Sequence, residues 1–62
     1  MRNMELVKEI IENKPMEYKT VVKCWKSLWY HKTYDKRPLW NALNVLGITE
    51  NEFCVCRARY GL

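Results

Sequence analysis

The sequence predicts an all-α fold of four short helices around one small, aromatic-rich core. Apolar residues recur at helical spacing in four separate stretches. Pro15 separates the first two stretches, and Gly47 and Gly61 follow the last two, where a left-handed residue commonly ends a helix. The 62 residues make a single domain. A chain this short buries only about 60% of the surface that its unfolded form exposes, so we expect a thin stability margin.

The first helix is expected from about Met4 to Asn13. Its apolar residues recur at helical spacing: Leu6, Val7, Ile10 and Ile11. Asn3 can cap this helix, because its side-chain oxygen can accept a hydrogen bond from a first-turn amide. Pro15 ends the helix, since the residue before a proline is driven out of the α region.

The second helix is expected from Pro15 to about Tyr30 or His31. A wide apolar stripe marks it as the central wall of the core: Tyr18, Val21, Val22, Trp25, Leu28 and Trp29. A strand is the competing interpretation, but strict alternation fails at Val21 and Val22. A second face carries Lys19, Lys23, Lys26 and Tyr30. This face either follows a phosphate backbone or is a solvated lysine surface.

A polar connector from His31 to Arg37 leads to the third helix. His31 is expected to cap the end of the second helix. The third helix should begin at about Lys36 or Pro38, with Asp35 as its N-cap, and end at Leu46. Its inner face is predicted to hold Leu39, Ala42, Leu43 and Leu46.

Thr49 is expected to open the fourth helix. Thr49 and Glu52 have the spacing of a capping box, and Ile48 with Phe53 forms a hydrophobic staple. The inner face is predicted to hold Phe53, Cys56 and Tyr60. Gly61 closes the helix, and Leu62 can fold back on it.

The basic residues are concentrated in the middle of the chain. The net charge is +4, and residues 18–48 hold six basic side chains against Asp35 alone. Such a field favours a phosphate backbone or an acidic protein partner. No stretch approaches the roughly 20 apolar residues of a membrane span, and no signal peptide is recognisable. Three cysteines cannot all pair within one chain, so we expect a cytoplasmic protein with reduced thiols.

The sequence offers little for catalysis. One histidine supports no dyad, and two glycines make no phosphate-binding loop, so we expect neither enzymatic activity nor a cofactor. A zinc site is conceivable from Cys24, His31, Cys54 and Cys56. Cys54 and Cys56 diverge on a helix and lack the usual ligand spacing, however, so the cysteines are expected to serve as small apolar residues. If residues 53–60 formed a strand instead, Cys54 and Cys56 would share one face, which would favour the zinc site.

Residues 38–60 resemble the helix-turn-helix family of DNA-binding proteins. Gly47 falls where that family places its turn glycine, and Ala42 and Leu46 lie where its first helix directs apolar residues inward. The packing positions of its second helix hold Ile48, Phe53 and Cys56. The family prefers a small residue four positions before the glycine, where this chain has Leu43. A different crossing angle between the two helices would follow.

The resemblance implies a small transcription regulator that binds duplex DNA, as a dimer. Its recognition helix would face the bases with Thr49, Glu50, Asn51, Cys54 and Val55. The residues expected to bind DNA are Thr49 and Asn51, together with the basic Lys19, Lys23, Lys26, Lys36, Arg37, Arg57 and Arg59. Lys32 would add a further phosphate contact.

The alternative function is a small protein-binding module, such as an inhibitor or adaptor of the kind phages and mobile elements encode. It would act through an exposed aromatic and basic surface, because such interfaces use aromatic and arginine anchors. The aromatic residues exceed what so small a core needs: Trp25, Trp29, Tyr30, Tyr34 and Trp40.

Overall fold

The computed structural model describes residues 3–32 and 34–62, so Thr33 of the predicted connector lies outside the described residues. Four helices follow one another along the chain: α1 (Met4–Asn13), α2 (Pro15–Tyr30), α3 (Arg37–Leu46) and α4 (Glu50–Tyr60). Neither described range contains a strand. The all-α prediction is confirmed.

Local hydrogen bonds fix the ends of α1 and α4 as the sequence predicted. Asn3 Oδ1 accepts a hydrogen bond from the Glu5 amide at 2.8 Å. Thr49 and Glu52 form the full capping box. The Thr49 hydroxyl accepts from the Glu52 amide at 3.1 Å, and Glu52 Oε1 accepts from the Thr49 amide at 2.9 Å.

Left-handed glycines end the last two helices. Gly47 has φ +94° and Gly61 has φ +67°. His31 occupies the C-cap position of α2, where its amide donates to the Ser27 carbonyl at 3.0 Å. These three predictions are also confirmed.

The start of α3 differs from the expected one. Lys36, not Asp35, is the N-cap residue, and it makes no side-chain capping bond. Asp35 Oδ1 still accepts from the Arg37 amide at 3.1 Å, and both its oxygens accept from the Arg37 guanidinium at 2.9 Å. These bonds hold the pKa of Asp35 at about 2, below its usual 3.8. Asp35 therefore accepts from the first amide of α3, but it stands one residue before the N-cap instead of at the N-cap.

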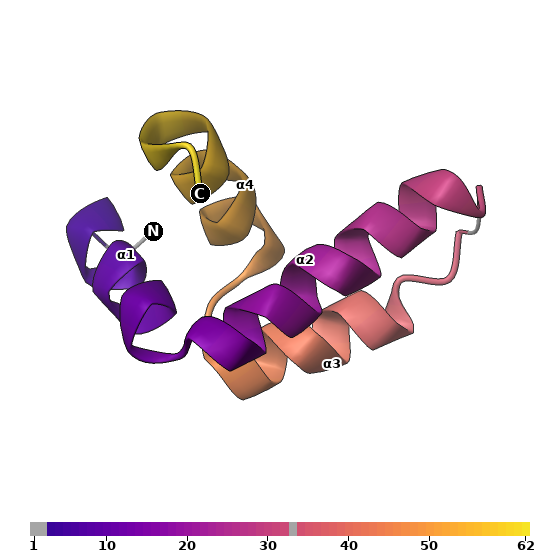
Figure 1. Cartoon of the computed structure of the whole chain (residues 1–62), viewed down its shortest axis with the longest axis horizontal. Helices are drawn as coiled ribbons and strands as arrows, with labels where there is room; N and C mark the ends of the chain where they lie inside the picture. The colour runs from indigo at the N-terminus through magenta and orange to yellow at the C-terminus, as the bar shows by residue number, and fades with distance from the viewer. Residues whose placement is uncertain (1–2, 33) are drawn as a thin grey trace.

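The helices pack in an order that differs from the order along the chain. Figure 1 shows α2 and α3 lying antiparallel, with α1 and α4 on one side of them. The principal contacts join α2 to α3 and α1 to α4, with further contacts between α1 and α2. The last turns of α2 extend beyond α4 (Figure 1).

The inner face of α4 packs on α1 and α2. Cys56 Sγ lies 3.9 Å from the Met4 carbonyl oxygen. The Phe53 ring centre lies 5.9 Å from that of Tyr18 and 6.1 Å from that of Trp25. The last two helices therefore do not form the main packed pair, and the helix-turn-helix resemblance stays a prediction.

The core is mostly aliphatic. Its buried residues are Met4, Val7, Ile11, Val21, Leu39, Leu43, Leu46, Ile48, Phe53 and Cys56. Two residues predicted on core faces are instead exposed, Leu6 at 54% and Trp29 at 71%. Trp29 is the last residue but one of α2, whereas the ring contacts between α2 and α4 lie earlier in the helix, at Tyr18 and Trp25.

Candidate functional site

Exposed aromatic side chains gather at the end of the α2–α3 pair that α4 leaves uncovered. Tyr30 is 83% exposed and Tyr34 97%, close in sequence to the exposed Trp29. Lysines interleave with these rings. We call this region the aromatic–basic surface, defined by Trp25, Lys26, Leu28, Trp29, Tyr30, Lys32, Tyr34 and Lys36.

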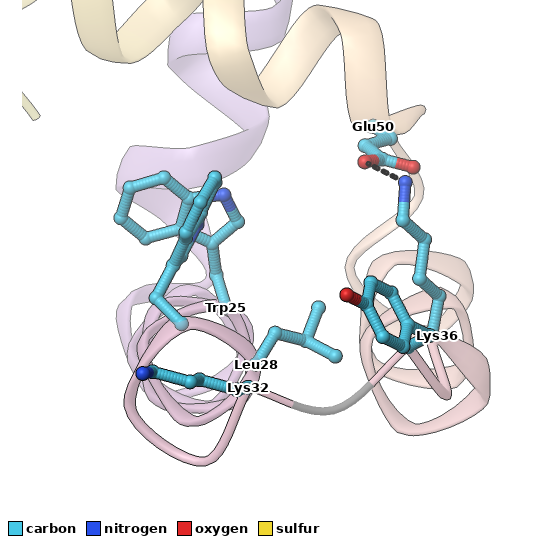
Figure 2. Close-up of a pocket in the computed structure, with 7 residues that line it drawn as sticks. Trp25, Leu28, Lys32, Lys36 and Glu50 are labelled. Atoms are coloured by element: carbon cyan, nitrogen blue, oxygen red, sulfur yellow. Dashed lines mark hydrogen bonds and ion pairs between the residues drawn. The ribbon is translucent and has the colours of Figure 1, made fainter.

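A groove of about 400 Å³ opens within this surface, between α2 and the start of α4. Its lining comes from Trp25, Leu28, Trp29, Lys32, Tyr34, Lys36 and Glu50. The rings of Trp25 and Trp29 meet edge to face, with centres 6.1 Å apart. In Figure 2, Lys32 and Lys36 lie on opposite sides of the groove, with Leu28 between them. The groove therefore has apolar walls and a basic rim.

Glu50 connects the beginning of α4 to the beginning of α3. Its Oε1 lies 3.3 Å from Lys36 Nζ (Figure 2). Its Oε2 accepts a hydrogen bond from Trp40 Nε1 at 3.1 Å. An ion pair that is partly open to solvent is worth only about 0–1 kcal/mol, so this pair adds little to the stability of the fold.

Arg57 holds Trp25 in place from the other side. Its guanidinium carbon lies 4.3 Å from the centre of the Trp25 ring. Its Nε donates to the Leu62 carbonyl at 3.2 Å, and Leu62 packs against the core as predicted. The Arg57 side chain is therefore engaged inside the fold rather than directed to a phosphate.

The lysines of α2 predicted to bind DNA lie on its outer face. Lys19, Lys23 and Lys26 are exposed. With 3.6 residues per turn, they lie about 140–160° around the helix from the buried Val21. The α4 contacts of α2 come instead through Tyr18 and Trp25. This lysine row thus points away from the core.

The other predicted DNA-binding residues are dispersed. Lys36 reaches the start of α4 and pairs there with Glu50. Arg37 pairs with Asp35. The Thr49 hydroxyl is used in the capping box, whereas Asn51 and Arg59 are exposed. Of these residues, Lys36 is the one that pairs with a side chain in the first turn of α4.

The cysteines occupy three different environments. Cys56 is buried beside Met4, Cys24 is half-buried and Cys54 is exposed. Burial raises the pKa of the Cys56 thiol. Because Cys54 is exposed, the prediction that it serves as a small apolar residue is wrong. Within residues 3–32 and 34–62, no three side chains of the metal-binding kinds come together.

The sequence interpretation missed the groove itself. It placed Glu50 on a base-reading face, although the Glu50 side chain turns back to Lys36 and Trp40. The one local signal of the groove was the helical spacing of Trp25, Leu28, Trp29 and Lys32. This spacing places a lysine at the end of an apolar helix face.

No helix in the described ranges is both long enough and apolar enough to cross a membrane. No known protein family, curated protein or solved structure matches this chain.

Proposed function

We propose that this chain is a small protein-binding module that engages an acidic partner through the aromatic–basic surface. One observation carries the proposal: Trp29, Tyr30 and Tyr34 are each more than two-thirds exposed beside a groove with lysines on its rim. Exposed aromatic residues that gather in this way mark interaction sites, since tyrosine and tryptophan dominate interface energetics.

The aromatic rings supply the affinity in this proposal, and the lysines supply selectivity. Burying a further 100 Å² or so of apolar surface on Trp29 is worth on the order of 2.5 kcal/mol. A pair between a rim lysine and a partner carboxylate contributes about 0–1 kcal/mol. Complementary charge mainly speeds association and rejects basic partners.

Duplex DNA is the second candidate, favoured by the exposed row Lys19, Lys23 and Lys26 on α2. The form of that proposal in which α4 enters the major groove of the DNA has less support. Glu50 stands at the front of α4, and the Thr49 hydroxyl is already bonded to the Glu52 amide. A carboxylate in that place would repel the phosphates that a recognition helix approaches.

Matched variants test the two candidates. The unaltered chain and its Trp29→Ala/Tyr34→Ala variant are each immobilised. Both are then exposed to an extract of the cells whose genome encodes the chain. Leu6→Ala serves as the control, because Leu6 is an exposed apolar residue on α1, outside the aromatic–basic surface. We expect a captured protein that the double variant loses and the control retains.

A parallel titration uses labelled duplex DNA at low and moderate salt. Duplex binding that weakens steeply with salt and is lost in Lys19→Gln/Lys23→Gln would reverse the order of the two candidates. Absence of duplex binding at low salt, together with selective protein capture, supports the protein-binding function.

A further inference from the structure

We propose that the groove binds a short acidic segment in which one bulky apolar side chain is flanked on both sides by carboxylates. The apolar side chain would rest against Trp25, Leu28 and Trp29, and the carboxylates would pair with Lys32 and Lys36. This inference rests on the proposed protein-binding function and specifies the chemistry of the segment that is bound.

The size and walls of the groove argue for a single large apolar side chain. Its volume of about 400 Å³ lies toward the lower end of the 300–1,000 Å³ or so that is typical of ligand pockets. Two indole rings set edge to face, with Leu28 beside them, offer apolar surface that a leucine, phenylalanine or tryptophan side chain would cover. A polar side chain there would lose its water without finding a hydrogen-bonding partner on the indole faces.

The positions of the lysines argue for a carboxylate on each side. Lys32 follows the C-cap of α2 and Lys36 is the N-cap of α3, on opposite sides of the groove (Figure 2). A segment lying across the groove would meet each lysine with a different residue. Of the described residues that line the groove, Glu50 alone carries a carboxylate, and it is already bonded to Lys36 and Trp40.

The backbone conformation of Lys32 allows a clean test of its side chain. Lys32 has φ +51°, a left-handed conformation that glycine adopts at lower cost. A residue with a side chain at such a position is uncommon, and the strain is of order 1 kcal/mol. Lys32→Gly therefore removes the charge without straining the fold, which makes it a sharp test of the ammonium group.

Glu50 acts as an internal competitor in this arrangement. It occupies Lys36 in the free chain, so an incoming carboxylate must share or displace it. Glu50→Gln removes the competing charge and keeps an oxygen that can accept from Trp40. We expect this variant to bind acidic segments about 1.5- to 5-fold more tightly, the range that corresponds to a partly exposed ion pair.

The first experiment selects random peptides, displayed on phage, against the immobilised full chain. We expect enrichment of peptides in which leucine, phenylalanine or tryptophan has aspartate or glutamate on both sides. Enrichment of basic or uncharged peptides, or of none, overturns the inference.

The second experiment titrates a synthetic copy of an enriched peptide into isotope-labelled chain. We expect the indole signals of Trp25 and Trp29 to shift, and Lys32→Gly and Lys36→Gln each to weaken binding about 1.5- to 5-fold. Leu6→Ala is the matched control and should bind as the unaltered chain does. Unchanged affinity in both lysine variants contradicts the inference.

Two further comparisons separate the possible failures. If the cellular protein is lost with Trp29→Ala/Tyr34→Ala but retained by Lys32→Gly/Lys36→Gln, the inference of flanking carboxylates fails and the protein-binding function stands. If no variant changes capture, both fail. The second comparison uses oligothymidylate, because the bases of single-stranded nucleic acid stack on exposed aromatic rings. If oligothymidylate binds more tightly than any selected peptide and is released by salt, the peptide inference is overturned in favour of single-stranded nucleic acid.

Discussion

The guanidinium of Arg57 lies over the Trp25 ring, 4.3 Å from its centre, and links the last helix to the proposed binding groove. Trp25 also meets Phe53 and Trp29 edge to face. A single indole thus joins the buried core to the exposed aromatic–basic surface. We expect this junction to restrict the motion of the Trp25 ring, and a site on firmly held side chains loses less entropy when it binds.

Arg57→Ala should destabilise the fold by about 1–2 kcal/mol. The substitution removes a cation–π contact, worth roughly 0.5–2 kcal/mol, together with the packing of the arginine stem on Trp25. Urea denaturation followed by Trp fluorescence measures the change. Arg59→Ala is the control on the same helix, because Arg59 is exposed, and it should alter stability by less than about 0.5 kcal/mol. Equal effects of the two substitutions would contradict the structural role assigned to Arg57.

Thr49→Ala should cost about 1 kcal/mol of unfolding free energy, within the 0.5–2 kcal/mol or so measured for lost N-caps. The hydroxyl accepts from the Glu52 amide, and its removal leaves that amide without its capping partner. Thr49→Ser keeps the oxygen and should restore most of the loss. A serine variant as unstable as the alanine variant would show that the methyl group, not the capping bond, stabilises the start of α4.

Gly47→Ala should destabilise the chain through backbone strain alone. The residue has φ +94°, and a Cβ placed there meets nothing within 4 Å, so no clash contributes. The left-handed conformation costs an L-residue about 1–2 kcal/mol. Gly61→Ala is the matched comparison at φ +67°, closer to the left-handed region that L-residues tolerate, and should cost less. Thermal melting of both variants checks the order, and the reverse order contradicts it.

Acid should weaken the Asp35–Arg37 pair in a defined pH window. The pKa of Asp35 is held at about 2 in the fold, chiefly by hydrogen bonds from the Arg37 side chain, against 3.8 when unperturbed. A lowered folded pKa contributes stability that is fully present above 3.8 and is lost as pH falls toward 2.

The measurement is thermal melting of the chain and of Asp35→Asn across that window. We expect the difference between the two melting temperatures to shrink as the pH falls below 3.8. Arg37→Gln should reduce the same dependence, since it removes the guanidinium but leaves the hydrogen bond from the backbone amide of residue 37. A difference that stays constant with pH would show that the carboxylate charge is not what stabilises this turn.

Local signals in the sequence were sufficient for the four helices and most of their ends. The capping box at Thr49 and Glu52 and the left-handed Gly47 depend on residues no more than a few positions apart. Their physical cause is the need to satisfy terminal amides and carbonyls, which acts within one turn. The N-cap of α3 differed from the prediction. Lys36 is the N-cap, and Asp35, one residue before it, accepts from the Arg37 amide.

The candidate site was determined only in part by the sequence. An excess of aromatic residues and a basic middle section predicted an exposed surface of aromatic and basic side chains. Which aromatic residues form it depended on how far α4 covers α2, so that Trp25 is half-buried while Trp29 is exposed. Side-chain periodicity identifies a helix face, but it does not say where along that face the partner helix ends.

The sequence by itself determined the helices, their caps and the excess of lysine and aromatic side chains. The tertiary structure decided that α4 packs on α1, and that Glu50 turns back across 14 residues to Lys36. That contact sets the Glu50 side chain, at the front of α4, against Lys36 and Trp40. The physical reason is range: caps and turns are settled by neighbours within one helical turn, whereas a groove is settled by which helices meet.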